Sequence, residues 1–154
     1  SISLTGGEPL TEADFLLEFL PFAGHKIYLE TNGVLFENLK RLINYIDIVS
    51  MDIKLPSCTK GQDLFKEHEN FIKTAEKKEL FLKIVFDENI TVEEISKCAL
   101  LGRKYSVPLI LQPKMDGDIL NLKSEFIYEI FNKFIEYYPE TRLIPQVHKF
   151  LNIR

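Results

Sequence analysis

Acidic, amide and basic side chains gather in five short strings, each placed directly after an apolar run typical of a β-strand. The strings are TGGEP at 5–9, ETNG at 30–33, SMDIK at 50–54, QPK at 112–114 and PQVHK at 145–149. Carboxylates and exposed glycine carbonyls accept hydrogen bonds from an ammonium group, whereas a lysine presents a point charge to an anion. Polar groups that are buried without a partner cost free energy. The strings therefore predict a site for a polar, charged ligand.

Side chains along a strand alternate between its two faces, which divides each string into two sets. Ser50, Asp52 and Lys54 share one face, and Met51 and Ile53 share the other. Because ligands of parallel α/β proteins bind at the carboxyl ends of the strands, we expect the polar sets to converge on one cleft. The expected members are Glu8, Glu30, Asn32, Ser50, Asp52, Lys54, Gln112, Gln146 and His148.

Each string also has a plain structural explanation when it is taken alone. Two glycines after a strand commonly form a turn, and Asn32-Gly33 is an ordinary turn signal. Asp52 and Lys54 would form a salt bridge with no catalytic role, and His148 would be a surface residue. The two remaining histidines are most simply a loop residue, His25, and a helix residue, His68. The functional interpretation therefore depends on several strings meeting at strand ends.

The elements that must position these strings alternate along the chain. Strands are expected at 1–5, 26–31, 47–53, 80–86, 108–112 and 141–147, and helices at 12–20, 34–45, 62–77, 92–104 and 121–138. Thr11 is expected to cap the first helix, and Thr91 with Glu94 has the spacing of a capping box. This alternation predicts an α/β fold, a partial (β/α)-type barrel with a curved, mainly parallel sheet of about six strands and helices outside.

The composition is that of an ordinary globular protein, with 45% hydrophobic and 27% charged residues and a net charge of −4. Interspersed charges without a basic stripe argue against a nucleic-acid or membrane-surface partner. Without an apolar run of about 20 residues or a signal peptide, a cytoplasmic protein is expected. Cys58 and Cys98 lie too far apart for a C-x-x-C pair, and Cys98 falls on the apolar face of a helical pattern, which predicts a core residue.

The strings resemble the motifs of radical S-adenosylmethionine (SAM) enzymes. TGGEP resembles the motif that contacts the amino group of SAM, and ETNG and SMDIKLPS resemble the third- and fourth-strand signatures of that superfamily. Together with LQPK and RLIPQVHKFLNIR, they are most similar to the 7-carboxy-7-deazaguanine synthase family. That resemblance implies conversion of 6-carboxytetrahydropterin into the deazapurine precursor of queuosine and archaeosine, with SAM, a [4Fe–4S] cluster and Mg²⁺ as cofactors.

The resemblance also implies roles for individual residues. Gly7 and Glu8 would bind the SAM amino group, Ser50 and Lys54 its carboxylate or ribose, and Gln112 would lie near the adenine. Thr31 and Asn32 would line the pocket, Gln146 and His148 would contact the pterin-like substrate, and Glu30 and Asp52 resemble a cation site. The implied cofactor-binding residues are Gly6, Gly7, Glu8, Thr31, Asn32, Ser50, Asp52, Lys54 and Gln112, and the implied substrate-binding residues are Glu30, Gln146 and His148.

The cysteine motif that holds the family's cluster precedes TGGEP and does not occur in these 154 residues. Because the chain also opens inside a core strand, we expect residues 1–154 to be the C-terminal part of a radical SAM core domain. The chain alone is then expected to bind no cluster and to cleave no SAM. The complete enzyme would use an electron donor such as flavodoxin or ferredoxin, and the exposed strand edge allows a homodimer.

Two other functions fit parts of the sequence. An activase of the same superfamily would generate a glycyl radical in a partner protein, but such sequences do not end in PQVHK. A non-catalytic α/β domain would serve binding or scaffolding, and its polar strand-end groups would pair with one another. Titration of a longer protein with SAM separates this last function from the first two.

Overall fold

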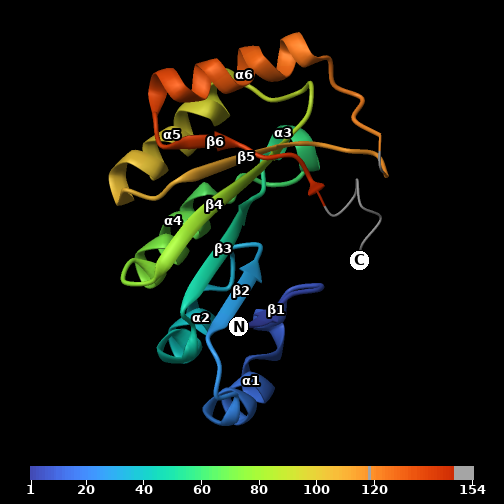
Figure 1. Cartoon of the computed structure of the whole chain (residues 1–154). Helices are drawn as coiled ribbons and strands as arrows, with labels where there is room; N and C mark the ends of the chain where they lie inside the picture. The colour runs from blue at the N-terminus through green and yellow to red at the C-terminus, as the bar shows by residue number, and fades with distance from the viewer. Residues whose placement is uncertain (118, 148–154) are drawn as a thin grey trace. The chain divides into compact units, whose positions relative to one another are not determined.

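The computed structural model describes residues 1–117 and 119–147, and the chain divides into two compact units. The first unit combines Ser1–Ile53 with Leu64–Phe81, and the second combines Lys54–Asp63 with the chain from Leu82 onward. His148, which the sequence predicts to contact the substrate, lies outside the described residues. Figure 1 shows the elements of both units in chain order.

The first unit holds three parallel strands, β1 (Ile2–Leu4), β2 (Ile27–Thr31) and β3 (Ile48–Ile53). Alternate positions along β2 differ in burial, because one face packs under helices. In β3 the residues Val49, Ser50 and Met51 are all buried. Leu29 lies opposite Val49 on the buried face, and Glu30 lies opposite Ser50 on the other face. Within β3, Met51 and Ile53 lie on the predicted apolar face, and Ser50 and Asp52 lie on the other face. Lys54 follows the strand and belongs to the second unit.

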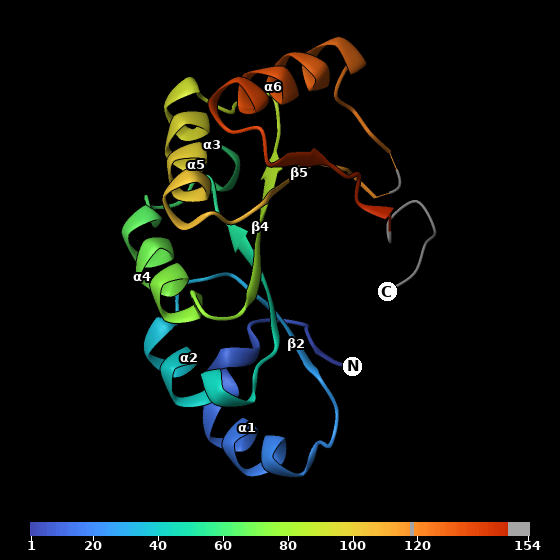
Figure 2. The ribbon, with the colours of Figure 1, turned by 60° about the vertical axis from the view of Figure 1, so that its left-hand side comes forward.

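Three helices cover the buried face of these strands. They are α1 (Ala13–Phe19), α2 (Phe36–Leu42) and α4 (Phe65–Ala75), and Figure 2 shows them together on one side of β2. The helices contribute fully buried side chains to this core: Leu39 and Leu42 from α2, and Phe71 and Ile72 from α4. The short 3-10 turns η1 (Pro9–Glu12), η2 (Leu20–Phe22) and η3 (Ile43–Tyr45) flank α1 and α2.

The expected cap of the first helix is wrong. Thr11 lies inside η1, which begins at Pro9 and is capped by Glu8, whose carboxylate accepts from the Leu10 amide. Proline favours the first position of a helical turn because its φ is already suitable and its missing N–H would be unpaired there. The Thr11 hydroxyl instead donates to the Glu8 carbonyl oxygen.

The second unit contains the rest of β4 (Glu79–Phe86, which begins in the first unit), β5 (Leu109–Pro113) and β6 (Thr141–Leu143), again paired in parallel. Its helices are α3 (Pro56–Thr59), α5 (Val92–Tyr105) and α6 (Ser124–Tyr137). The predicted capping box is present, since the Thr91 hydroxyl accepts from the Glu94 amide and the Glu94 carboxylate accepts from the Thr91 amide. Cys98 is fully buried, as predicted.

The α/β class and the six expected strands are confirmed, and their pairing within each unit is parallel. The last strand is shorter than the predicted range 141–147, because Pro145 lacks the N–H that a continuing ladder needs. Within the described ranges, no helix has the length and apolar character that a membrane span requires.

Candidate functional site

The loop after β1 presents two glycines in left-handed backbone conformations. Gly6 has φ +88° and Gly7 has φ +56°, and a β-carbon built on either one would meet no atom within 4 Å. Residues with a side chain rarely adopt these angles, so glycine leaves the backbone both correctly folded and accessible. The loop and α1 border a depression of about 420 Å³. A ligand therefore has direct access to the peptide groups of this loop.

The Glu8 carboxylate joins the loop after β1 to the loop after β2. Its Oε1 accepts from the Thr31 hydroxyl at 2.8 Å and from the Leu10 amide at 3.2 Å, and its Oε2 accepts from the Asn32 amide at 2.7 Å. A carboxylate offers about four acceptor positions, and three of them are used here. Glu8 thus holds the glycine loop in place and keeps acceptor capacity for one further donor.

The turn at Thr31–Gly33 is held by its own side chains as well. The Thr31 hydroxyl accepts from the Gly33 amide at 3.2 Å, and Asn32 Oδ1 accepts from the Val34 amide at 3.1 Å. Gly33 has φ +69°, and a β-carbon there would lie 2.5 Å from the Met51 side chain. Asn32-Gly33 therefore forms the predicted turn. The Thr31 hydroxyl and the Asn32 side-chain oxygen, which were candidates for ligand contact, hold this turn in place.

Three further predicted residues lie on the face of β2 and β3 that is opposite to Leu29 and Val49, within the first unit. Glu30 accepts from the Thr5 hydroxyl at 3.3 Å, and Ser50 is its register partner on β3. Ser50 has no exposed surface, and its hydroxyl finds no hydrogen-bond partner among the described residues. Asp52 follows two positions along β3, on the same face. A buried hydroxyl without a partner costs free energy that a bound polar ligand would recover.

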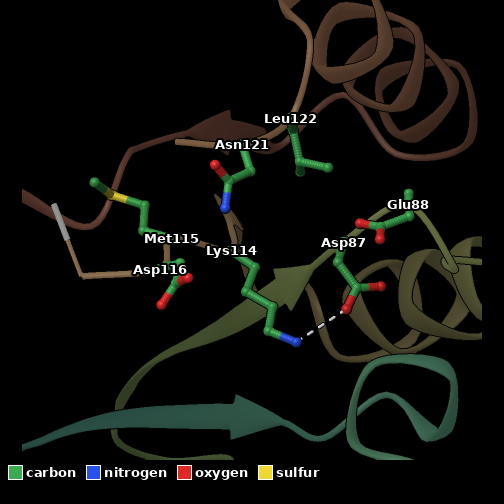
Figure 3. Close-up of a pocket in the computed structure, with 7 residues that line it drawn as sticks. All are labelled: Asp87, Glu88, Lys114, Met115, Asp116, Asn121 and Leu122. Atoms are coloured by element: carbon green, nitrogen blue, oxygen red, sulfur yellow. Dashed lines mark hydrogen bonds and ion pairs between the residues drawn. The ribbon is translucent and has the colours of Figure 1, made fainter. Parts of the chain in front are cut away.

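In the second unit, polar groups meet after the carboxyl ends of β4 and β5. Asp87 follows β4 and is buried; its carboxylate accepts from Lys114 Nζ at 3.1 Å, from the Asn89 amide at 3.0 Å and from the Cys58 thiol at 3.4 Å. Figure 3 shows the Lys114–Asp87 ion pair at one side of a pocket of about 280 Å³. The lining residues are Asp87, Glu88, Lys114, Met115, Asp116, Asn121 and Leu122.

The segment after β3 is anchored from two sides in this unit. The Glu94 carboxylate accepts from the Ser57 amide at 2.9 Å as well as from Thr91, so it caps both α5 and α3. Cys58, one residue further on, donates to Asp87. Burial raises the pKa of the Cys58 thiol, and the neighbouring Asp87 carboxylate adds to the increase, so this cysteine is a poor nucleophile at neutral pH. These contacts fix the backbone that follows Lys54.

Gln112 and Gln146 also belong to the second unit. Gln112 is half-buried on β5 opposite Val85, and Gln146 Oε1 accepts from the Met115 amide at 3.3 Å. The predicted single cleft joins Lys54, Gln112 and Gln146 to residues of the first unit, and it stays a prediction. Gln112 lies near the carboxyl end of β5, and Gln146 follows β6 by three residues.

The sequence interpretation missed three residues that organise these loops: Asp87, Glu94 in its contact with Ser57, and His68, which is fully buried in α4. Asp87 was detectable, because it directly follows the apolar run 80–86 as the other candidates follow theirs. The partners of Glu94 and His68 are 37 and 35 residues away, and no sequence pattern announces them. Among the described residues, no group of three or more His, Cys, Asp or Glu would hold a metal ion.

We predict that the stability of the second unit falls in acid through Asp87 and Glu94. Burial opposes ionisation of both carboxyls, but hydrogen-bond donors, chiefly from Asn89 and Lys114 to Asp87 and from Ser57 and Thr91 to Glu94, hold both pKa values below their ordinary range. A lowered folded-state pKa stabilises the protein fully above the unfolded pKa of about 4, and this contribution is lost as the pH falls through the folded-state pKa.

The measurement is a series of urea midpoints followed by circular dichroism between neutral pH and pH of about 3. The midpoint should hold steady down to a pH of about 5 and then fall. Glu94→Gln should show a smaller fall than the parent, whereas Glu88→Gln, at an exposed neighbouring carboxylate, should match the parent. An equal fall in the parent and in Glu94→Gln would contradict the role of Glu94.

The parallel pairing of the strands and the glycine-containing and polar loops that follow them define a parallel α/β protein. No family model matches the chain. It is 40% identical over 156 residues to 7-carboxy-7-deazaguanine synthase of Geobacter sulfurreducens, a match that covers 98% of this chain and 62% of that protein. It is 30% identical over 163 residues to the synthase of Archaeoglobus fulgidus, covering 100% of this chain and 67% of that protein.

The chain belongs to the 7-carboxy-7-deazaguanine synthase family. A third relative, the synthase of Methanopyrus kandleri, is 30% identical over 99% of the chain and 60% of its own length. The chain thus spans 60% to 67% of the length of these relatives.

Proposed function

We propose that this chain is the SAM- and substrate-binding part of a radical SAM enzyme that converts 6-carboxytetrahydropterin into 7-carboxy-7-deazaguanine. The observation that carries the proposal is the match of nearly the whole chain to proteins named 7-carboxy-7-deazaguanine synthase, at 40% identity in one case. The accessible glycine loop supports it, and so does the buried Ser50 hydroxyl, which has no partner among the described residues, because a charged ligand would use both.

In the first unit, the backbone carbonyls of Gly6 and Gly7 would accept from the amino group of SAM. Glu8 would add one charge-assisted hydrogen bond from its remaining acceptor capacity, while its other contacts keep the loop in place. Ser50 would donate to the carboxylate or ribose of SAM, which would give its buried hydroxyl a partner. Bound SAM would supply a sulfonium that is cleaved once an electron reaches it.

The remaining roles in the proposal follow the resemblance. Lys54 would offer its charge to the SAM carboxylate, and Gln112 would lie near the adenine. Gln146 and His148 would pair with the heteroaromatic edge of the substrate, which offers matching donors and acceptors. Glu30 would face the substrate, and Glu30 with Asp52 would attract Mg²⁺, a cation that needs only one or two protein carboxylates.

The residues of this chain do not fit an iron–sulfur cluster. The two cysteines are Cys58, whose thiol donates a hydrogen bond to Asp87, and Cys98, which is fully buried in α5. Cluster ligation requires several thiolates at one place. In the proposal the ligands come from a segment that precedes Ser1, and a flavodoxin or ferredoxin delivers the electron. Reading the coding sequence upstream of Ser1 for C-x-x-x-C-x-x-C is the first check.

The decisive experiment is anaerobic reconstitution of the longer protein that contains this chain, followed by incubation with SAM and 6-carboxytetrahydropterin. Formation of 7-carboxy-7-deazaguanine would support the proposal. Binding of SAM with no turnover of the pterin, but with glycyl radical formation in a partner protein, would favour an activase. A protein that binds no SAM would be a non-catalytic α/β domain.

Lys54→Ala should weaken SAM binding in the same protein by on the order of 1.5–3 kcal/mol, because a charge-assisted hydrogen bond is removed. Calorimetric titration with SAM measures this change. Lys26→Ala is the matched control, because Lys26 is exposed just before β2. Substitution of His148 should raise the KM for the pterin and leave SAM affinity nearly unchanged. Equal loss of SAM affinity in the Lys54 and His148 variants would refute this division of roles.

A further inference from the structure

His68 is a fully buried histidine in α4 that no motif explains. Its Nδ1 lies 3.1 Å from the Gly33 carbonyl oxygen, and its ring meets Phe65 edge-on with the ring centroids 6.4 Å apart. Because a carbonyl oxygen only accepts hydrogen bonds, Nδ1 carries the proton. A buried imidazole costs free energy unless its polar atoms form hydrogen bonds. The hydrogen bond from Nδ1 therefore favours the position that the Gly33 carbonyl oxygen occupies.

The Gly33 carbonyl oxygen belongs to a tightly enclosed turn. A β-carbon at Gly33 would lie 3.1 Å from His68 Nδ1 and 2.5 Å from the Met51 side chain, so the turn is enclosed by α4 on one side and β3 on another. The amide of Gly33 donates to the Thr31 hydroxyl, which in turn donates to Glu8. The Asn32 amide donates to the same carboxylate.

Hydrogen bonds on both sides of Gly33, joined through its backbone, therefore link α4 to the glycine loop. They run from His68 to Gly33, from Gly33 to Thr31, and from Thr31 to Glu8, with distances of 3.1, 3.2 and 2.8 Å. Every member belongs to the first unit. Displacing the Gly33 carbonyl would move Thr31 and Asn32, two of the three donors to the Glu8 carboxylate.

We propose that His68 is a positioning residue, which locks the Thr31–Gly33 turn through the Gly33 carbonyl and so fixes Glu8 and the Gly6–Gly7 loop for binding SAM. This inference rests on the proposed function, because the glycine loop is taken as the SAM contact. His68 touches no ligand itself; it acts through the turn and Glu8.

The test compares three substitutions in the longer protein that contains this chain. In His68→Asn, the side-chain amide nitrogen occupies roughly the place of Nδ1 and keeps the donor. In His68→Gln, the donor is moved one bond outward, and in His68→Leu it is lost. His25→Leu, at an exposed loop histidine, is the control. SAM affinity is measured by calorimetry, and hydrogen exchange of the Asn32 and Gly33 amides is followed without ligand.

His68→Leu and His68→Gln should bind SAM about tenfold more weakly and exchange both amides faster, since a buried carbonyl loses its donor. His68→Asn should stay within about twofold of the parent. A purely structural histidine would lower the melting temperature in all three without this ordering. Parent-like SAM affinity in a folded Leu or Gln variant, or an Asn variant as weak as Gln, would overturn the inference. Should the Leu variant fail to fold, the Asn–Gln pair still decides.

The two proposals fail in different ways. A parent protein that binds no SAM would overturn the proposed function and with it the SAM part of this inference. Amide exchange in the ligand-free variants would still show whether His68 locks the turn. Unchanged exchange at Asn32 and Gly33 in His68→Gln would overturn the locking role, whatever the parent binds.

Discussion

Glu8→Ala should lower the free energy of unfolding by about 3 kcal/mol and, under the proposed function, remove most of the SAM affinity of the longer protein. The carboxylate accepts hydrogen bonds from Leu10, Thr31 and Asn32, so its loss leaves three donors without their partner and frees the loop after β1 from the loop after β2. Urea unfolding measures the first effect, and calorimetric titration with SAM measures the second.

Glu18→Ala is the matched control, because Glu18 is an exposed carboxylate of α1 and is not among the residues that line the depression beside the glycine loop. Its stability and SAM affinity should stay close to those of the parent. Glu8→Gln should fall between parent and Glu8→Ala, since one carbonyl oxygen still accepts while the new NH₂ faces a donor. Glu8→Ala with full SAM affinity would show that the glycine loop needs no such anchor.

Gly33→Ala should destabilise the protein by about 3 kcal/mol, from two causes that act together. A φ of +69° is unfavourable for any residue with a β-carbon, and that β-carbon would lie 2.5 and 2.6 Å from the Cγ and Sδ atoms of Met51. Thermal or urea unfolding provides the measurement. The turn would shift to relieve the clash, so Glu8 would lose its alignment as well.

Gly24→Ala separates the two causes. Gly24 has a similar φ of +63°, but a β-carbon there would meet nothing within 4 Å. This control should lose only about 1 kcal/mol, the cost of the backbone conformation alone. Equal losses at Gly24 and Gly33 would mean that Met51 moves aside freely, and that the turn is less tightly enclosed than the distances indicate.

Much of the fold could be predicted from the sequence, because local patterns carry it. The six apolar runs became strands since period-two alternation and helical spacing differ clearly, and the Thr91–Glu94 capping box depends only on neighbouring residues. Local rules failed where two of them competed. Proline favours the first position of a helical turn, so the 3-10 turn η1 begins at Pro9, earlier than the predicted helix start. Thr11 therefore lies inside η1 and does not cap a helix.

The polar strand-end loops of the first unit could be located from the sequence, but the hydrogen bonds that connect them could not. Strand ends marked Glu8, Thr31, Asn32 and Ser50 as polar groups at one edge of the first unit. The sequence did not reveal that the Glu8 carboxylate accepts three hydrogen bonds within the protein, because its Thr31 and Asn32 partners are 23 and 24 residues away. Such long-range pairs form only when packing brings the loops together. His68 escaped prediction for the same reason.

Glu94 binds two backbone segments at once, the start of α5 at Thr91 and the start of α3 at Ser57. A fluctuation that unwinds the first turn of α5 would carry away the acceptor of the Ser57 amide, so the two helix starts should open as one cooperative unit. Lys54 lies three residues before Ser57 in the sequence. The mobility of the segment around Lys54 is then governed by the fraying of a helix that begins at Val92.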